Sequence, residues 1–307
     1  MAAVLNTNAA SLYASKNLQA AQSKMANSVE RLSSGLRINH AKDDAAGLGI
    51  ANALSQQING ANQGIRNLND GISMVQTAEG AIAAAQEMGQ RILTLATQGS
   101  NGTIGASERN AIRKEMRQLL IAIDSIGTRT KFSGNSLLGN VVGAGTAITL
   151  QVSNVTTDTI TLAASAFEKI GVGTTTANSN NGTIEAGDVA WSGGLASALA
   201  VAVNTVATGT DETQANQLAV LGAAKTYIDN LSTRRSLLGA YQNQIEFTVS
   251  NVTELASNLS AARSNVQDTD YASETASLTK GQILQQAATA MLAQANQMPN
   301  VILSLLK

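Results

Sequence analysis

The sequence predicts a mainly α-helical protein in which the N- and C-terminal halves form a long, coiled-coil-like helical bundle. Near both ends, apolar residues recur at alternating spacings of four and three, the pattern of helices that pack along a seam. Between about residues 141 and 210 this rhythm gives way to a stretch rich in Gly, Thr, Asn and Ala. The one proline, Pro299, leaves the helices free to run uninterrupted. Seams at both ends can pack in parallel bundles along a shared axis, a design that suits an assembly subunit better than a pocket.

The first predicted helix carries the N-terminal seam. Its apolar positions are Leu18, Met25, Val29, Leu32 and Leu36. Ser33-Ser34-Gly35 interrupts the seam, and residues 39–49 are rich in helix breakers and capping residues. Asp43 and Asp44 stand just before Ala45, where carboxylates favour a helix N-terminus. We therefore expect a second helix to begin near Ala45.

The second helix has the clearest pattern in the chain. One heptad position is occupied in turn by Leu54, Ala61, Leu68, Val75, Ile82, Gly89 and Ala96. The other is occupied by Ile58, Ile65, Ile72, Glu79, Gln86 and Leu93. At ~1.5 Å per residue, this sustained spacing predicts a single helix about 75 Å long. Residues 98–105 have the composition of a turn, and a third helix is predicted from Ser107 to Ile126.

The middle of the chain predicts a small β-hairpin followed by an insert. Short alternating runs at 147–152 and 159–162 flank Thr156-Thr157-Asp158, which is consistent with a hairpin near 147–163. Residues 171–211 are small and polar, and we interpret them as a short, irregular, variable surface insert. A single helix is expected within it, around Leu195 to Val206.

Helical periodicity resumes at Leu221. One seam of this helix contains Ala224, Leu231, Leu238, Ile245, Val252 and Leu259. A break rich in capping residues at 267–270 precedes the last helix. The last helix carries Leu284, Ala288, Met291, Ala295, Met298, Ile302 and Leu305 at spacings of four and three.

Composition narrows the classes of partner. A net charge of −1 provides no basic field that would attract nucleic acid or an anionic membrane. Charged residues are 13% of the chain, against ~25% in typical globular proteins, and such a surface suits long helix–helix contacts. The N-terminal residues lack a basic region and an apolar run, so no cleavable secretory signal is predicted. No apolar stretch approaches the ~20 residues of a membrane span, so membrane insertion is not expected.

Catalytic and cofactor sites are not predicted. The chain has no cysteine and one histidine, His40, which its neighbours place in a loop between helices. Asp43 and Asp44 could act as paired carboxylates, but helix capping explains them better. Gly171-Val-Gly is only a fragment of a dinucleotide-binding pattern and no helix signature follows it. We therefore expect no enzyme, no cofactor and no metal site.

Several segments resemble bacterial flagellin closely. In the first half these are Glu30-Arg-Leu-Ser-Ser-Gly-Leu-Arg-Ile-Asn39, Ala41-Lys-Asp-Asp-Ala-Ala-Gly47, Asn69-Asp-Gly-Ile-Ser73 and Gln76-Thr-Ala-Glu-Gly80. In the second half they are Ala293-Gln-Ala-Asn-Gln297 and Leu303-Ser-Leu-Leu306. The resemblance covers about residues 1–165 and 215–307, in the same order. His40 stands where small residues are more usual.

The resemblance implies a three-part organisation. Residues 1–44 and 268–307 would form an inner coiled-coil layer that lines the bore of a filament. Residues 45–170 and 212–267 would form an outer, rod-like helical bundle with the β-hairpin, and 171–211 would be the surface insert. Self-assembly would depend on the two terminal seams, which consist of Leu18, Met25, Val29, Leu32, Leu36, Leu284, Met291, Met298, Ile302 and Leu305.

The resemblance also implies function and partners. The chain would be a structural subunit that polymerises with other flagellin subunits into the helical flagellar filament used for swimming. It would be secreted through the flagellar export apparatus with a flagellin-specific export chaperone, and it would meet the filament cap and hook-junction proteins outside the cell. Arg91, Leu95 and Glu115 match positions by which the flagellin-sensing Toll-like receptor grips some flagellins, although Thr94 stands where that motif usually carries an acid.

Three alternatives remain open on the sequence. A hook–filament junction protein shares the terminal motifs but would match the C-terminal Leu-Ser-Leu-Leu block less well. An autotransporter-like or coiled-coil enzyme is disfavoured by the empty catalytic inventory. A coiled-coil adhesin would have to bind through residues 171–211.

Overall fold

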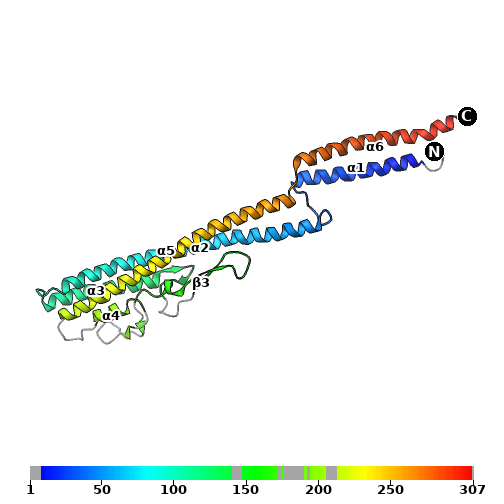
Figure 1. Cartoon of the computed structure of the whole chain (residues 1–307). Coiled ribbons are helices and arrows are strands. Elements are labelled where there is room, and N and C mark those ends of the chain that lie inside the picture. The colour runs from blue at the N-terminus through cyan, green and yellow to red at the C-terminus, as the bar shows by residue number, and fades with distance from the viewer. Residues whose placement is uncertain are drawn as a thin grey trace. The chain divides into compact units, whose positions relative to one another are not determined.

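The computed structural model describes residues 8–139, 147–171, 174–175, 190–191, 194–204 and 213–305, without the side chains at 174–175, 190–191, 204 and 298–305. Its helices are α1 (Ala9–Ser34), α2 (Ala45–Gly99), α3 (Ala106–Arg129), α4 (Ser197–Asn204), α5 (Gln214–Gln267) and α6 (Tyr271–Leu305) (Figure 1). The chain divides into a terminal unit, residues 1–59 with 256–307, and a central unit, residues 60–255. The mainly α-helical fold class with a small β-hairpin is confirmed.

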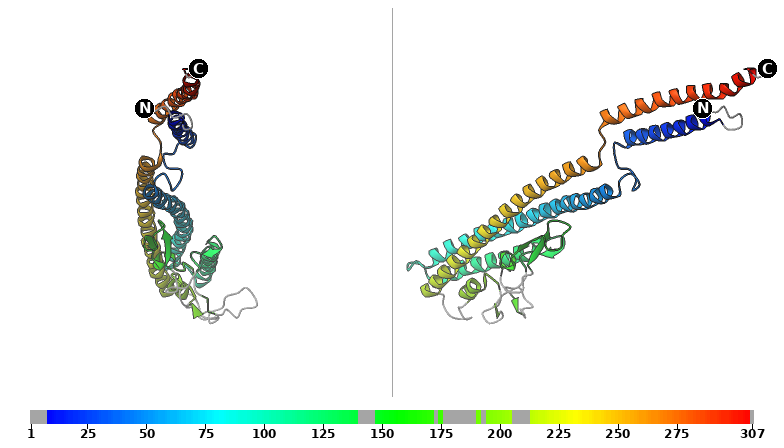
Figure 2. Two further views of the ribbon diagram at one scale, coloured as in Figure 1. Left: turned by 90° about the vertical axis from the view of Figure 1, so that its right-hand side faces the viewer. Right: turned by 45° about the vertical axis from the view of Figure 1, so that its right-hand side comes forward.

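The core of the terminal unit is the pair formed by α1 and α6, which lie side by side in all views (Figures 1 and 2). Asn8 Nδ2 donates a 2.7 Å hydrogen bond to the Ala295 carbonyl, and Arg31 lies 3.7 Å from Glu274. Residue numbers therefore increase along α1 in the direction in which they decrease along α6. The helices run antiparallel, so the expectation of parallel packing is wrong for this pair.

Two chain breaks separate these helices from α2 and α5, as the sequence predicts. Gly35 ends α1 with a left-handed φ of 73°, which favours glycine because it has no Cβ, and its N–H donates to the Arg31 carbonyl. The two breaks bond to each other: the Arg37 N–H donates to Gln267, and the Thr269 N–H donates to Gly35. The end of α1 and the start of α6 are thereby fastened together.

The two aspartates of the first break have separate structural roles. Asp44 Oδ1 accepts from the Gly47 N–H at 2.8 Å, so Asp44 caps the start of α2 as predicted. Asp43 Oδ2 accepts from the backbone N–H of His40 at 2.9 Å and closes the loop. The hydrogen bond from His40 lowers the pKa of Asp43. Both carboxylates are therefore explained by backbone hydrogen bonds.

The central unit is built on α2, α3 and α5. The first of the two heptad positions predicted for α2 is buried from Ala61 to Ala96. Its residues Leu68, Val75 and Ile82 are fully enclosed. Arg235 of α5 reaches Gln86 at 3.1 Å and Glu79 at 3.3 Å, so it meets the two polar residues that interrupt the second heptad position of α2. Because Gly89 lies beside Tyr227 and Gly99 beside Gln217, α2 and α5 run antiparallel.

The predicted β-hairpin forms and lies directly on α2. Strand β3 (Ile148–Gln151) pairs antiparallel with β4 (Thr159–Leu162). A Cβ on Gly64 would overlap the Val152 carbonyl, and a Cβ on Gly71 would overlap Leu150. Asn67 Nδ2 donates a 3.0 Å hydrogen bond to the Gln151 carbonyl. The glycines of α2 therefore leave the room that the hairpin needs to pack directly against the helix.

A buried segment after the hairpin ties α3 to α5; we call residues 163–171 the strap. The Tyr241 hydroxyl accepts from the Ala163 N–H, and the Tyr227 hydroxyl donates to the Ile170 carbonyl at 3.1 Å. Glu168 pairs with Arg234 of α5 at 2.6 Å, and Lys169 pairs with Asp124 of α3 at 3.2 Å. Burial raises the pKa of Tyr227 and lowers that of Arg234, although Glu168 opposes the second shift. Sequence patterning alone does not predict these hydrogen bonds and ion pairs.

Helix α4 corrects the interpretation of residues 171–211. A helix was expected there, and α4 confirms it. However, α4 is in contact with α3, and its apolar residues Leu199, Ala200 and Val203 are buried. The description of the whole stretch as a surface insert is therefore wrong for residues 194–204. Residues 176–189 and 205–212 lie outside the described part of the chain.

Two short antiparallel pairs complete the described strands. β1 (Lys131–Phe132) pairs with β2 (Asn135–Ser136) around Gly134, whose φ is 85°. β5 (Thr174–Thr175) pairs with β6 (Ala190–Trp191). A single 3-10 turn, η1 (Ala164–Phe167), lies within the strap.

Candidate functional site

The described residues offer little for catalysis. Within them, no three or more His, Cys, Asp or Glu side chains gather as a metal site would require, and no helix is long and apolar enough to cross a membrane. His40, the lone histidine, lies in the loop predicted for it, where its Nε2 is 2.7 Å from Glu30 Oε1. Functional surfaces must therefore be sought among apolar faces and surface charges.

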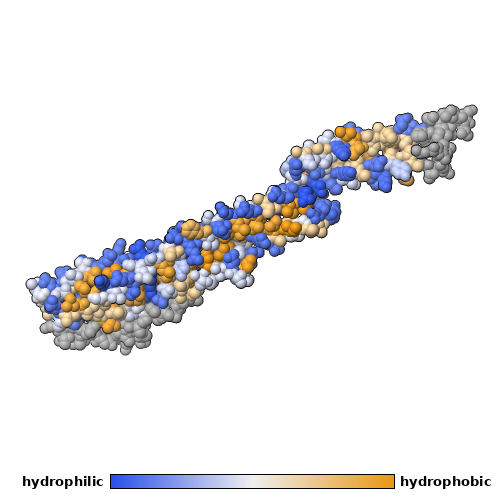
Figure 3. All heavy atoms as spheres, viewed as in Figure 1, coloured by the Kyte–Doolittle hydropathy of each residue, from blue (hydrophilic) through white to orange (hydrophobic). Residues whose placement is uncertain are grey.

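A shallow apolar groove of about 620 Å³ runs along the α1–α6 pair. Its floor is made of alanines from both helices, including Ala14, Ala21 and Ala288, and its larger lining residues include Tyr13, Leu284 and Met291. Figure 3 shows hydrophobic side chains exposed on this pair. Small side chains let two helices approach closely, and beside the larger side chains they leave an apolar hollow on the surface of the pair.

The predicted terminal seam residues separate into two groups. Leu18, Met25, Leu32 and Leu36 are half-buried. Val29, Leu284 and Met291 are exposed, with Met291 66% accessible, so they lie outside the contact between the two helices. Helix α6 includes Met298, Ile302 and Leu305, whose side chains lie outside the described ones. Val29, Leu284 and Met291 therefore remain exposed on the pair, and their part in self-assembly stays a prediction.

Small residues make much of the contact between α1 and α6, and among the buried ones the predicted seams included only Ala295. Ala14, Ala21 and Ser28 repeat every seven residues on α1 and are buried. On α6, Gly281 and Ala295 are buried, and Gly281 faces Met25. Repeated small residues at heptad spacing were the signal that could have located this contact.

The three candidate receptor-contact residues differ in their exposure to solvent. Arg91 and Glu115 form a salt bridge between α2 and α3, with Nη2 2.7 Å from Oε1, and their side chains are 55% and 47% exposed. Leu95 is only 2% exposed. Leu95 belongs to the core of the central unit, and the prediction that it contacts a receptor is wrong for this structure.

Family models match both ends of the chain. The bacterial flagellin N-terminal helical region matches residues 5–142, and the bacterial flagellin C-terminal helical region matches residues 221–306. Together the two models cover most of the chain, including all of α1, α2, α3 and α6.

Similar proteins agree with the family models. Polar flagellin F of Vibrio parahaemolyticus is 34% identical and flagellin D of Vibrio cholerae 35% identical, each over all of both chains. These alignments run over 379 positions whereas this chain has 307 residues, so the relatives carry residues that it lacks.

A solved structure from Vibrio parahaemolyticus, assigned as a flagellar hook-associated protein, has a TM-score of 0.55 over 74% of this chain and all of that one. Its identity of 13% shows a shared fold and nothing finer. The full-length matches to flagellins, in contrast, reach a level of identity that places the chain in one family. The chain belongs to the bacterial flagellin family.

Proposed function

We propose that this chain is a structural subunit of the bacterial flagellar filament and that it polymerises through the outward face of its α1–α6 pair. The observation that carries the proposal is the apolar groove, whose exposed Leu284 and Met291 stand beside a floor of alanines. Leu12 and Ile283 add further exposed apolar surface to the same two helices. Family membership supports the filament itself.

The physics of a two-helix pair supports this use of its surface. Two helices that contact each other through alanine, serine and glycine bury little apolar area, so their association contributes little stability. Contacts with neighbouring subunits would cover the groove and add the missing burial. If the groove receives a different surface of the neighbouring subunit, the contact is heterologous, and heterologous contacts that do not close produce open helical polymers.

The proposal extends to the partners and the location of the protein. A filament subunit would leave the cell through the flagellar export apparatus with an export chaperone, and it would meet the cap and the hook-junction proteins at the ends of the filament. Its location would then be extracellular. Flagellins are a family of structural proteins, and a structural role is the one proposed for this chain.

We further propose that Arg91 and Glu115 form the part of the α2–α3 surface that a flagellin-sensing Toll-like receptor could contact. Both side chains are about half exposed, whereas Leu95 is enclosed. Combined substitution of Arg91 and Glu115 by alanine should weaken binding of the soluble receptor ectodomain, and Lys114→Ala on the exposed face of α3 should not. Equal binding by the two variants would contradict this extension.

Polymerisation of purified protein tests the main proposal. Met291→Glu places a charge in the groove without disturbing a buried side chain, so helix content should be unchanged while filament yield falls sharply. Gln286→Glu adds the same charge to an exposed position of α6 that does not line the groove. Electron microscopy should show long filaments for the wild type and Gln286→Glu only. Normal filaments from Met291→Glu would refute the groove as the assembly surface.

The same experiment separates a filament subunit from a hook–filament junction protein. A filament subunit adds copies of itself without limit, so it forms long, uniform polymers at sufficient concentration. A junction protein would remain in short assemblies under the same conditions. Long filaments from the unmodified chain are therefore the expected result.

A further inference from the structure

Three Asn-Gly pairs occur in the chain, and the two that the structure describes lie in opposite environments. Asn101-Gly102 is in the turn between α2 and α3, whereas Asn59-Gly60 is inside α2. The third pair, Asn181-Gly182, lies outside the described residues. Glycine leaves the backbone nitrogen after an asparagine unhindered, so that nitrogen can attack the side-chain amide carbon where the local conformation allows it.

The turn presents Asn101 and Gly102 in a form suited to that attack. Both residues are exposed, and a Cβ built on Gly102 would meet nothing within 4 Å. Asn101 Oδ1 accepts a 3.3 Å hydrogen bond from the Thr103 N–H, which draws the side chain toward the backbone that follows it. The Gly102 N–H donates to no backbone carbonyl of the described residues, so no such bond has to break first.

The helical conformation of α2 disfavours the same attack at Asn59. In a helix interior each N–H bonds to the carbonyl four residues earlier, and the helical ψ turns the next nitrogen away from the side-chain amide. The hairpin also packs against Gly60, because a Cβ on Gly60 would lie 2.8 Å from Asn154 Cβ. Reaction at Asn59 would require local opening of a long, well-packed helix.

We propose that Asn101 is a site of spontaneous deamidation, whereas Asn59 is protected. The Gly102 nitrogen gives up its proton and bonds to Asn101 Cγ, the Cγ–Nδ2 bond breaks, and Nδ2 leaves as ammonia. Water then opens the resulting succinimide at either of its carbonyls, which gives aspartate or isoaspartate. One water is consumed, one ammonia is released, and the residue gains a carboxylate.

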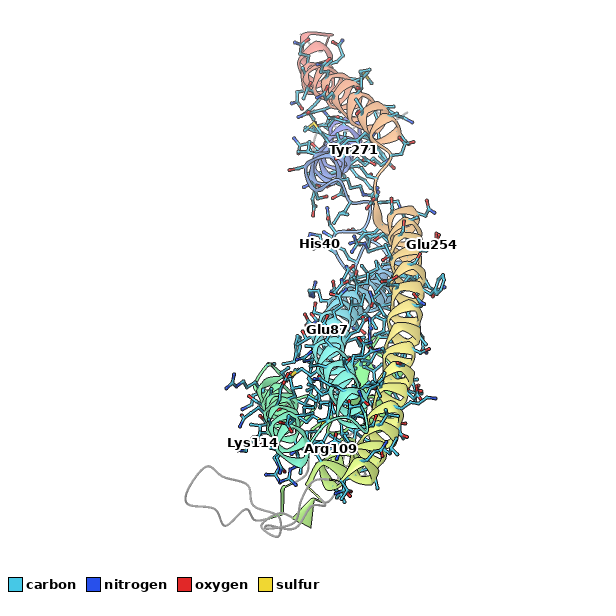
Figure 4. All side chains as sticks on the ribbon, turned by 90° about the vertical axis from the view of Figure 1, so that its left-hand side faces the viewer. His40, Glu87, Arg109, Lys114, Glu254 and Tyr271 are labelled. Atoms are coloured by element: carbon cyan, nitrogen blue, oxygen red, sulfur yellow. The ribbon has the colours of Figure 1, made fainter. Side chains whose placement is uncertain are left out.

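Arg109 makes this modification consequential for the turn. Its Nε donates to the Gly99 carbonyl at 3.0 Å and its Nη2 to the Asn101 carbonyl at 3.1 Å, at the α2–α3 end of the central unit (Figure 4). A carboxylate at position 101 would stand close to this guanidinium, which favours the charged product. Isoaspartate lengthens the main chain by one carbon and so displaces the carbonyl that Arg109 and the Ile104 N–H hold.

Peptide mapping by mass spectrometry tests the proposal on the full-length protein. Folded protein is incubated in mildly alkaline buffer, and isoaspartate is measured by transfer of a labelled methyl group with an isoaspartyl methyltransferase. Asn101 should convert at least an order of magnitude faster than Asn59. In urea, where the helix is lost, the two rates should converge, because both pairs then have the same local chemistry.

Gly102→Ala is the matched variant. Gly102 has open space around the position of a Cβ and its φ is not left-handed, so alanine fits without strain. The added methyl group hinders the nitrogen, and conversion at Asn101 should fall by at least an order of magnitude while that at Asn59 stays unchanged. Equal rates at Asn59 and Asn101 in the folded protein, or an unchanged rate in Gly102→Ala, would overturn the proposal.

Discussion

Single glycines of α2 decide where the hairpin lies. Gly60, Gly64 and Gly71 each have hairpin atoms where a Cβ would stand, and at Gly64 the obstacle is a backbone carbonyl that no side-chain rotation can move. Gly80 of the same helix has nothing within 4 Å of that position. The same residue type therefore has opposite energetic consequences at two sites on one helix.

Gly64→Ala should destabilise the central unit even though alanine favours helix. The added carbon overlaps the Val152 carbonyl, and overpacking of this kind costs about 1–3 kcal/mol. Gly80→Ala should instead raise the free energy of unfolding by about 0.5–1 kcal/mol, because it only improves helix propensity. Urea unfolding followed by circular dichroism measures both. Stabilisation by both substitutions would mean that the hairpin does not sit on Gly64.

Tyr227 predicts a dependence of stability on alkaline pH. Burial raises its pKa above the ordinary value of 10.0, so the folded state holds the phenolic proton where the unfolded state has lost it. Its contribution to stability is complete below the unfolded pKa and declines as pH rises above it.

Tyr227→Phe should remove that part of the alkaline decline. It should also cost about 1–3 kcal/mol at neutral pH, because the Ile170 carbonyl loses its buried donor. Unfolding free energies of the two proteins, measured across neutral and alkaline pH, check both effects. Parallel pH profiles for the two proteins would show that Tyr227 is not the group responsible.

Among the secondary-structure elements, α2 has two buried faces, one that the heptad spacing predicts and one that it does not. Its heptad face, with Leu68, Val75 and Ile82, is buried as the spacing indicates. Ile92 and Leu95 are buried as well, although they belong to another arc of the helix. Because α3 and α5 both contact α2, its C-terminal part is covered on more than one side.

Leu68→Asp should unfold or severely weaken the central unit. A carboxylate at this fully enclosed position loses its hydration without gaining a partner, at a cost of several kcal/mol. Asn62→Asp is the control, since Asn62 is exposed on the same helix. Asn67 would be a poor control, because its side chain donates to the Gln151 carbonyl. Thermal melts that do not differ between the two variants would refute the assigned register.

Helix α4 should resist replacement although residues around it are rich in polar and small side chains. Substitution of residues 197–204 by a Gly/Ser linker removes the fully buried Leu199 and Ala200 from the surface of α3. Loss of one large buried side chain costs about 2–5 kcal/mol, so the melting temperature should fall by several degrees or more. An unchanged melting temperature would restore the original interpretation of the stretch as a surface insert.

For the chain as a whole, the central feature is that the helices near its two ends, α1 and α6, pack together. Helices α1 and α6 are in contact although almost the whole sequence separates them. Hydrogen bonds hold both ends of the pair, at Asn8 and at the two chain breaks. Helices α1 and α6 belong to the terminal unit, whereas residues 60–255 form a compact unit of their own. A change at the chain end can therefore affect assembly without affecting the central core.

Deletion of residues 301–307 should abolish polymerisation while the central unit stays folded. Ile302 and Leu305 continue the apolar spacing of α6, and their removal shortens the surface that we propose for assembly. The urea unfolding transition of the central unit should be unchanged, because residues 60–255 have their own core. Sedimentation and electron microscopy report the loss of filaments. Filaments of normal length from the truncated protein would contradict the assigned role of the chain end.

Periodicity and capping chemistry are sufficient to predict the helices without any tertiary contact. The heptads around Leu68 and Leu238 predicted buried faces, Gly35 and Asp44 marked helix ends, and alternation at 148–162 predicted the hairpin, because each signal depends on neighbours within a few residues. The motifs in both halves of the chain indicated the family, because each is a short run of consecutive residues that can be recognised without the tertiary structure.

Tertiary structure alone decided which partner covers each face. Spacing places Leu284 and Met291 on one side of α6, but only the approach of α1 through Ala14 and Ala21 shows that the two larger residues remain outside. Likewise, nothing within a few residues of Leu95 reveals that it is enclosed, or that Tyr227 meets Ile170. A repeat specifies which side chains share a face, whereas burial depends on atoms from chain segments that are distant in sequence.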